Sequence, residues 1–226
     1  MKLIYAIIIF LFSLEKSIAQ DTVITIKAGE DVSALYKHIY KYPVFSTGTV
    51  YFNDGTIARS KMNLNLLLEV MQFINDKGDT LALDDENTIK HITVGADTFF
   101  FQEGYLQLVS TYGKTELVAR QKIKFLNEKN IGAYGLSTAT HTIDNYNTLR
   151  AFGTYSLKLN KDLIYSKEKK FFFSKGNDGF ILANKKNILK MFSDKKSLVE
   201  KYLAEQKPDY NNEEDLKNLF VYLSTF

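Results

Sequence analysis

The fold is decided by residues 48–83, which read GTVYFNDGTIARSKMNLNLLLEVMQFINDKGDTLAL. Residues 49–52 are β-rich and run directly into Asp54-Gly55, a pair that favours a tight hairpin because glycine tolerates a positive φ. Apolar residues then repeat at intervals of two from Met62 to Leu68, but also at three and four over residues 67–74. The turn residues 75–79 and the apolar residues after them indicate another hairpin, which favours strands over residues 57–74. A helix over residues 65–74 is the open alternative.

Short β-type runs separated by turn residues continue on both sides of this stretch. They cover residues 23–26, 89–94, 98–101, 105–109 and 116–125. The short connections between them imply antiparallel pairing, because parallel strands need a crossover of about a dozen residues. We therefore predict a mainly β fold, α+β overall, in which an antiparallel meander forms a curled sheet or an open barrel.

Residues 127–149 differ in kind, being rich in Gly, Ser, Thr and Asn with little apolar periodicity. We predict a long loop there, and loops of more than about 15 residues are usually either functional or flexible. This loop supplies the candidate binding residues Tyr134, His141, Asp144 and Tyr146. Strand character returns at residues 155–159, 163–165 and 171–173, and the turn at residues 176–179 predicts a hairpin into residues 180–182.

Residues 183–226 are predicted to form about three short helices, either packed on the β-rich part or trailing behind it. Apolar residues recur there at spacings of one, three and four, which gives an apolar face. Ser193-Asp194 is the expected start of the second helix, and Pro208 is expected to end it. Asn211 or Asn212 is expected to cap the third helix, whose first turn is acidic, as the helix dipole favours.

Residues 1–19 have the three parts of a secretory signal: a positive start at Lys2, an apolar run over residues 3–14, and Ser17-Ile-Ala19 before the cleavage point. The apolar run is shorter than the roughly 20 residues of a membrane-spanning helix, and no later segment approaches that length. We predict a cleaved signal at residues 1–19, a β-rich domain at 20–182 and a helical module at 183–226, with no transmembrane segment in the mature chain. The protein would then be periplasmic, outer-membrane-associated or secreted.

The composition argues against several classes of function. The chain has no cysteine, which removes disulfides, thiolate chemistry and Cys-ligated zinc. Its net charge is +3, which is too small to argue for nucleic acid as a partner. Lysines cluster at residues 167–170 and 185–196, beside the phenylalanines at 171–173, a pattern that suits nucleic acid or an anionic glycan. Solvated strand edges and helix surfaces are the simpler interpretation.

No motif predicts a cofactor, a metal ion or a catalytic centre. His38, His91 and His141 stand far apart in sequence, whereas zinc sites usually take two ligands from one local motif. The acidic residues between positions 76 and 86 lack calcium-loop spacing and suit solvated hairpin turns. The sequence contains neither a Gly-x-Ser-x-Gly nucleophile elbow nor a phosphate-binding glycine loop.

Several stretches carry a resemblance to a protein family. They are the signal ending in Ala19-Gln20, residues 48–55 with 62–74 and 77–83, and a tail made of residues 185–192, the apolar positions of 198–203, and residues 214–216. With these stretches the chain resembles uncharacterised secreted proteins of Bacteroidota over most of its mature length. The resemblance implies the compartment and the architecture, and it implies no activity, cofactor or site residue.

These features together predict a class of function. An exported antiparallel β scaffold without a reactive motif is expected to be a non-enzymatic binding or assembly module of the cell envelope, with an envelope protein or a glycan as partner. The alternative is a hydrolase whose carboxylates meet only in three dimensions, as facing acids with shifted pKa values in a concave pocket. A third possibility is a structural role in which an edge of the sheet pairs with another chain.

Overall fold

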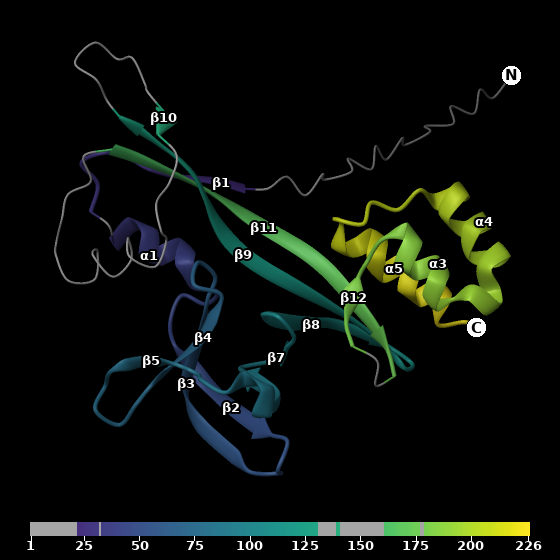
Figure 1. Cartoon of the computed structure of the whole chain (residues 1–226), viewed down its shortest axis with the longest axis horizontal. Helices are drawn as coiled ribbons and strands as arrows, with labels where there is room; N and C mark the ends of the chain where they lie inside the picture. The colour runs from purple at the N-terminus through teal and green to yellow at the C-terminus, as the bar shows by residue number, and fades with distance from the viewer. Residues whose placement is uncertain (1–21, 32, 131–138, 141–160, 177–178) are drawn as a thin grey trace, which may run out of the picture.

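The computed structural model describes residues 22–31, 33–130, 139–140, 161–176 and 179–226 (Figure 1). Over these residues the protein is mainly β with a few short helices, which confirms the predicted fold class. The strands are β1 (Thr22–Ile26), β2 (Ser46–Phe52), β3 (Ile57–Asn65), β4 (Val70–Ile74), β5 (Thr80–Ala82), β6 (Ile89–Val94), β7 (Asp97–Phe101), β8 (Tyr105–Tyr112), β9 (Thr115–Asn130), β10 (Ala139–Thr140), β11 (Lys161–Lys175) and β12 (Ile181–Leu182). The helices are α1 (Ser33–Ile39), α3 (Lys185–Met191), α4 (Lys196–Gln206) and α5 (Glu213–Leu223), with 3-10 turns at Glu86–Thr88 and Ser193–Lys195.

The strands form one antiparallel sheet that stays open. Along its main path the order is β1-β11-β9-β8-β7-β6-β2-β3-β4-β5, with β10 on β9 and β12 on β11. Two meanders, β2 to β5 and β6 to β9, are joined where β2 pairs with β6. The sheet curls and brings β9 beside the end of β3, where the Ile123 N–H donates to the Leu66 carbonyl at 2.8 Å.

The stretch from β2 to β4 contains the hairpins that its turn residues predict. Gly55 adopts φ 88° between β2 and β3, and the Asp54 carboxylate accepts from the Thr56 N–H at 2.8 Å. After β3 the chain reverses, and the Asn65 side-chain oxygen accepts from two backbone N–H groups in that reversal, at 3.1 and 3.0 Å. This local bonding ends β3 and allows β4 to return beside it, so the alternative helix over residues 65–74 is wrong.

Two strands run further than the sequence predicts. β9 continues to Asn130, and β10 pairs with Glu128 and Lys129 of β9. The prediction of one loop over residues 127–149 is therefore wrong for residues 127–130 and 139–140, which are in strands. Residues 141–149 lie outside the described part of the chain. Residues 163–165 and 171–173, predicted as separate runs, belong to the single strand β11. β11 pairs with β9 along almost its whole length, and this ladder holds polar residues of low strand propensity in extended conformation.

Two hydrophobic cores lie on this sheet, and β9 and β11 contribute to both. The first core fills the curled part and includes Leu35, Ile39, Val50, Met62, Ile92, Phe99, Ile123 and Tyr165. The second core lies between one end of the β9–β11 ribbon and the C-terminal helices, and includes Leu117, Ala119, Phe171, Phe173, Ile188, Val199, Leu216 and Phe220. The helices are therefore packed on the sheet, where Figure 1 shows them gathered at that end of the ribbon.

The C-terminal helices match their predicted signals at some ends and not at others. Asn212 caps α5, as expected, and accepts from the N–H groups of Glu214 and Asp215. Ser193-Asp194 does not cap α4, because these residues form a 3-10 turn and α4 starts after Lys195 without a side-chain cap. α4 ends at Gln206, and Lys207 takes a left-handed conformation just before Pro208. No helix in the described ranges is both long and apolar enough to cross a membrane.

Candidate functional site

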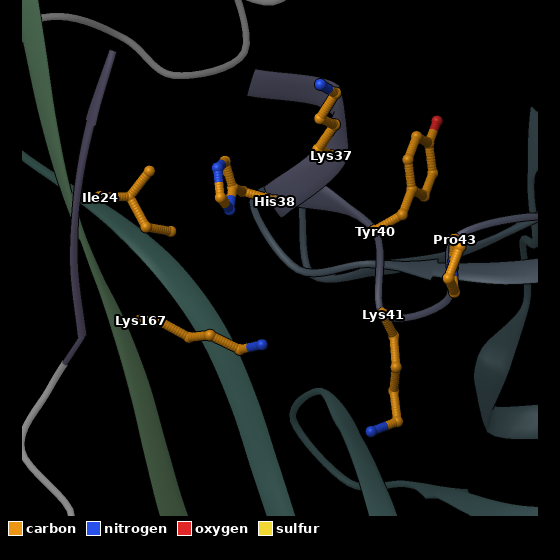
Figure 2. A pocket seen from close by; sticks show the side chains of 7 residues that line it. All are labelled: Ile24, Lys37, His38, Tyr40, Lys41, Pro43 and Lys167. Atoms are coloured by element: carbon orange, nitrogen blue, oxygen red, sulfur yellow. The ribbon is translucent and has the colours of Figure 1, made fainter. Parts of the chain in front are cut away.

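A small cavity opens where α1 faces β1 and β11 (Figure 2). Its volume is about 290 Å³. It is lined by Ile24, Lys37, His38, Tyr40, Lys41, Pro43 and Lys167. We call it the basic pocket, because three lysines and a histidine, and no carboxylate, are among these lining residues.

α1 places Lys37 and His38 at the rim of the basic pocket. Leu35 and Ile39 are four residues apart and therefore share one face of the helix, where both are buried in the first core. The residues between them face solvent, and both Lys37 and His38 are exposed. The helix is short, so its position depends on this burial more than on intrinsic propensity.

The chain just after α1 is tied to β3, which fixes the position of Lys41. The Lys41 N–H donates to the Leu64 carbonyl at 3.0 Å. The Asn63 side chain completes the tie, since its oxygen accepts from the Tyr42 N–H at 3.1 Å and its nitrogen donates to the Tyr42 carbonyl at 2.9 Å. The Lys41 side chain is half-buried, with Nζ 3.5 Å from Oε1 of Gln121.

Lys167 reaches the pocket from a polar gap between the two cores. Tyr165 belongs to the first core and Phe171 to the second, and the two positions between them on that face of β11 are Lys167 and Lys169. Lys169 forms an ion pair with Glu213 of α5, in which Nζ lies 2.5 Å from Oε2. The exposed Lys167 side chain forms no hydrogen bond or ion pair with any side chain in the described ranges, so no described counter-charge accompanies it at the pocket.

The positive charge around the pocket affects the titration of Lys41. Burial is the main cause that lowers the pKa of the Lys41 amine, and the nearby charges of Lys167 and Lys169 lower it further. Asp97 and Glu213 act in the opposite direction without reversing the shift. An anion bound in the pocket would offset the repulsion among these lysines.

The lining side chains do not all point the same way. Figure 2 shows the Lys167 amine directed toward the side of the pocket where Lys41 lies, with the His38 ring between α1 and β1. The Lys37 amine and the Tyr40 hydroxyl point away, and Tyr40 Oη donates to Gln72 Oε1 at 2.9 Å. The Lys41 amine points away from α1 and His38, and the Lys167 amine lies between the two, so an anion beside Lys167 has the Lys41 amine on one side and the His38 ring on the other. Ammonium groups supply charge-assisted hydrogen bonds to such an anion.

The sequence predicted little of this site. Tyr134, His141, Asp144 and Tyr146, the candidate residues of the predicted loop, lie outside the described residues. Lys167 belongs to a lysine cluster that the sequence shows, although solvated surface was the favoured interpretation of that cluster. Lys37, His38 and Lys41 carry no motif, and what brings them to Lys167 is the burial of α1 and the backbone ties to β3.

Neither a metal centre nor a pair of facing acids emerges from the residues that the structure describes. Within them, no three His, Asp or Glu side chains are grouped so that they could hold a metal ion. His91 stacks on Tyr51 with ring centroids 4.4 Å apart. The larger cavity beside α3, of about 950 Å³, has Glu103 as its one carboxylate, and two further cavities have one each, Asp54 and Glu116. The hydrolase alternative stays a prediction that no described cavity supports.

A comparison of the chain with protein-family models, with curated proteins and with solved structures finds no match. The site itself is therefore what indicates the function.

Proposed function

We propose that the protein is an exported, non-enzymatic binding module that holds an anionic group of a small glycan in the basic pocket. One observation carries the proposal: Lys41 and Lys167 share a cavity that no described carboxylate lines, and neither forms an ion pair with a described residue. Lysines without a counter-charge repel each other, and an anion between them removes that repulsion.

The size and walls of the pocket favour a sugar-sized ligand. A volume of about 290 Å³ lies at the lower end of small-molecule sites. Ile24 and Pro43 add apolar wall beside the cationic groups. Such a mixture suits a ligand that has both a ring face and a charged group, as a phosphorylated sugar does.

Thermal unfolding with glucose 6-phosphate and with glucose tests the proposal. A ligand that binds only the folded protein raises its melting temperature, so we expect glucose 6-phosphate to raise it and glucose to leave it unchanged. Added salt should reduce the effect by screening the lysines. Lys167→Gln should abolish the shift, whereas Lys186→Gln, at an exposed position of α3 away from the pocket, should preserve it. An equal shift in both variants would refute the proposed site.

Export is the second part of the proposal, and its support is the sequence pattern of residues 1–19. Expression of the full chain in a bacterium should give a shortened protein outside the cytoplasm whose first residue is Gln20. N-terminal sequencing of that protein, beside a variant with Ala19→Arg at the cleavage site, would check this. Recovery of the uncut chain from the cytoplasm would contradict export without affecting the pocket.

A further inference from the structure

Lys41 differs from the other lysines near the gap between the cores. Lys169 is paired with Glu213, and Lys122 lies within 4.0 Å of Glu168. Lys41 contacts an amide oxygen at 3.5 Å, the outer limit of a hydrogen bond, and its Nζ lies 5.8 Å from the centre of the Tyr42 ring. No carboxylate among the described residues is close enough to Lys41 for an ion pair. The charged amine therefore has no paired carboxylate among the described residues.

The surroundings of Lys41 lower the pKa of its amine, so the neutral form is more populated at a given pH than in an exposed lysine. Burial disfavours the ammonium ion, and Lys167 and Lys169 of β11 add like charge. Lys37 and His38 of α1 line the same cavity, while Asp97 of β7 and Glu213 of α5 are the opposing charges. Because the attractive and repulsive charges partly cancel, burial decides the direction, and the pKa of Lys41 is lowered.

The neutral form of a lysine amine is a nucleophile for carbonyl compounds, and Lys41 lines the basic pocket. We propose that Lys41 forms an imine with aldehydes or ketones that carry a phosphate or carboxylate group, which Lys167 and His38 hold in the basic pocket. This inference rests on the proposed function, since the same pocket must first attract the anion. It goes beyond that function by assigning a covalent step and the residue that carries it out.

The covalent step balances without any added reagent. The lone pair of Lys41 Nζ attacks the carbonyl carbon, and one N–H proton passes to the carbonyl oxygen to give a carbinolamine. The second N–H proton leaves with that oxygen as water, and a C=N bond remains. The half-buried setting of Lys41 favours the imine, because it limits the access of water that would hydrolyse it.

Pyridoxal 5′-phosphate is the probe for this step, since it carries an aldehyde and a phosphate. The purified protein is mixed with it at neutral pH, the imine absorbance is recorded, and the adduct is reduced with borohydride and mapped by peptide mass spectrometry. We expect the label on Lys41 ahead of the surface lysines. Pyridoxal, which lacks the phosphate, should label Lys41 to a much smaller extent. Lys41→Met, which keeps the aliphatic stem, should lose the absorbance, and Lys186→Met should keep it.

The possible outcomes separate this inference from the proposed function. If glucose 6-phosphate stabilises the protein but the label spreads over surface lysines, the imine proposal is wrong and the binding proposal stands. If pyridoxal labels Lys41 as strongly as pyridoxal 5′-phosphate does, the pocket does not select anions and both proposals are wrong. Because the mapping is done on the unmutated protein, a folding defect in a variant cannot produce either result.

Discussion

Gly48 allows β2 to approach both of its neighbours closely. A Cβ at this position would lie 2.8 Å from Met62 Sδ and 2.9 Å from the Thr93 carbonyl oxygen, on β3 and β6 respectively. The carbonyl belongs to the paired backbone and cannot move without disturbing the ladder. A glycine in the interior of a strand often marks such a close approach.

We therefore expect Gly48→Ala to lower the free energy of unfolding by about 1–3 kcal/mol through overpacking. Urea unfolding followed by circular dichroism would measure the change. Thr47→Ala is the matched control, because Thr47 is the exposed neighbour on the same strand. Equal stability of the two variants would show that the backbone shifts to accommodate the methyl group.

Tyr165 makes the free energy of unfolding fall as the pH rises through the alkaline range. Its ring packs edge-on against Phe125 with centroids 5.5 Å apart, and burial raises the pKa of its hydroxyl from 10.0 to about 12. The folded state thus retains this proton after the unfolded state has lost it. The contribution of Tyr165 to stability is complete below pH 10 and is lost as pH rises to about 12.

Tyr165→Phe should accordingly show a shallower loss of stability over this pH interval than the unmutated protein. Urea unfolding at a series of alkaline pH values would measure both slopes. Tyr36→Phe, at an exposed position, should leave the slope unchanged. A slope that is identical in all three proteins would mean that Tyr165 ionises as freely in the fold as in the unfolded chain.

The sequence shows which residue types line the pocket but does not show that Lys41 and Lys167 lie close together in the fold. Lys167 is visible as part of a run of lysines. Lys41 has no local signal, because what positions it is the contact of its backbone with Leu64 and of its neighbour Tyr42 with Asn63. Such contacts join segments about 20 residues apart in the chain and depend on the fold as a whole.

Among the helices, α5 has the clearest local start signal. The Asn212 side chain accepts from two backbone N–H groups that have no partner within the helix, at 2.9 and 3.1 Å. We expect Asn212→Ala to cost about 1 kcal/mol of stability, as N-cap removal commonly does. Asn211→Ala is the control, because Asn211 is exposed and precedes the cap. Thermal or urea unfolding would compare them, and an equal loss in both variants would contradict the assigned cap.

Elements with local signals are those that the sequence predicted. The β2–β3 hairpin needs Asp54 and Gly55, and both act within the turn itself. α1 was missed because a helix this short shows little periodicity. It places Leu35 and Ile39 in the first core and is stable through that burial. β11 was divided in the prediction because residues 166–170 are mostly charged, although its pairing with β9 continues through them.

The two cores are joined by strands that belong to both. β9 supplies Ile123 to the first core and Leu117 to the second, and β11 supplies Tyr165 and Phe173 in the same way. Loss of either core would remove packing from strands that the other core needs. We expect a single cooperative unfolding transition, with far-ultraviolet and near-ultraviolet circular dichroism changing together.

Leu216→Ala tests this coupling from the helical side. Leu216 is fully buried in the second core, so the substitution should destabilise by about 2–5 kcal/mol, and both spectral signals should shift by the same amount. Leu198→Ala, at an exposed position of α4, should have little effect. A helical signal that melts ahead of the rest would show that the two cores unfold separately.

At the scale of the whole molecule, the sequence indicated an antiparallel sheet but not its order. Short connections predict neighbours such as β6 and β7. The pairings of β1 with β11 and of β2 with β6 join distant segments, and no local turn specifies them. They follow from which apolar faces can be buried together, which depends on all strands at once.

The second core has a practical consequence for making shorter versions of this protein. A fragment that stops at Leu182 would keep Leu117, Phe171 and Phe173 on the ribbon and lose the helices that cover them. An exposed, contiguous apolar patch of this kind promotes self-association. Attempts to purify the strands alone should therefore yield aggregates, and a separately expressed C-terminal peptide added during refolding should restore solubility.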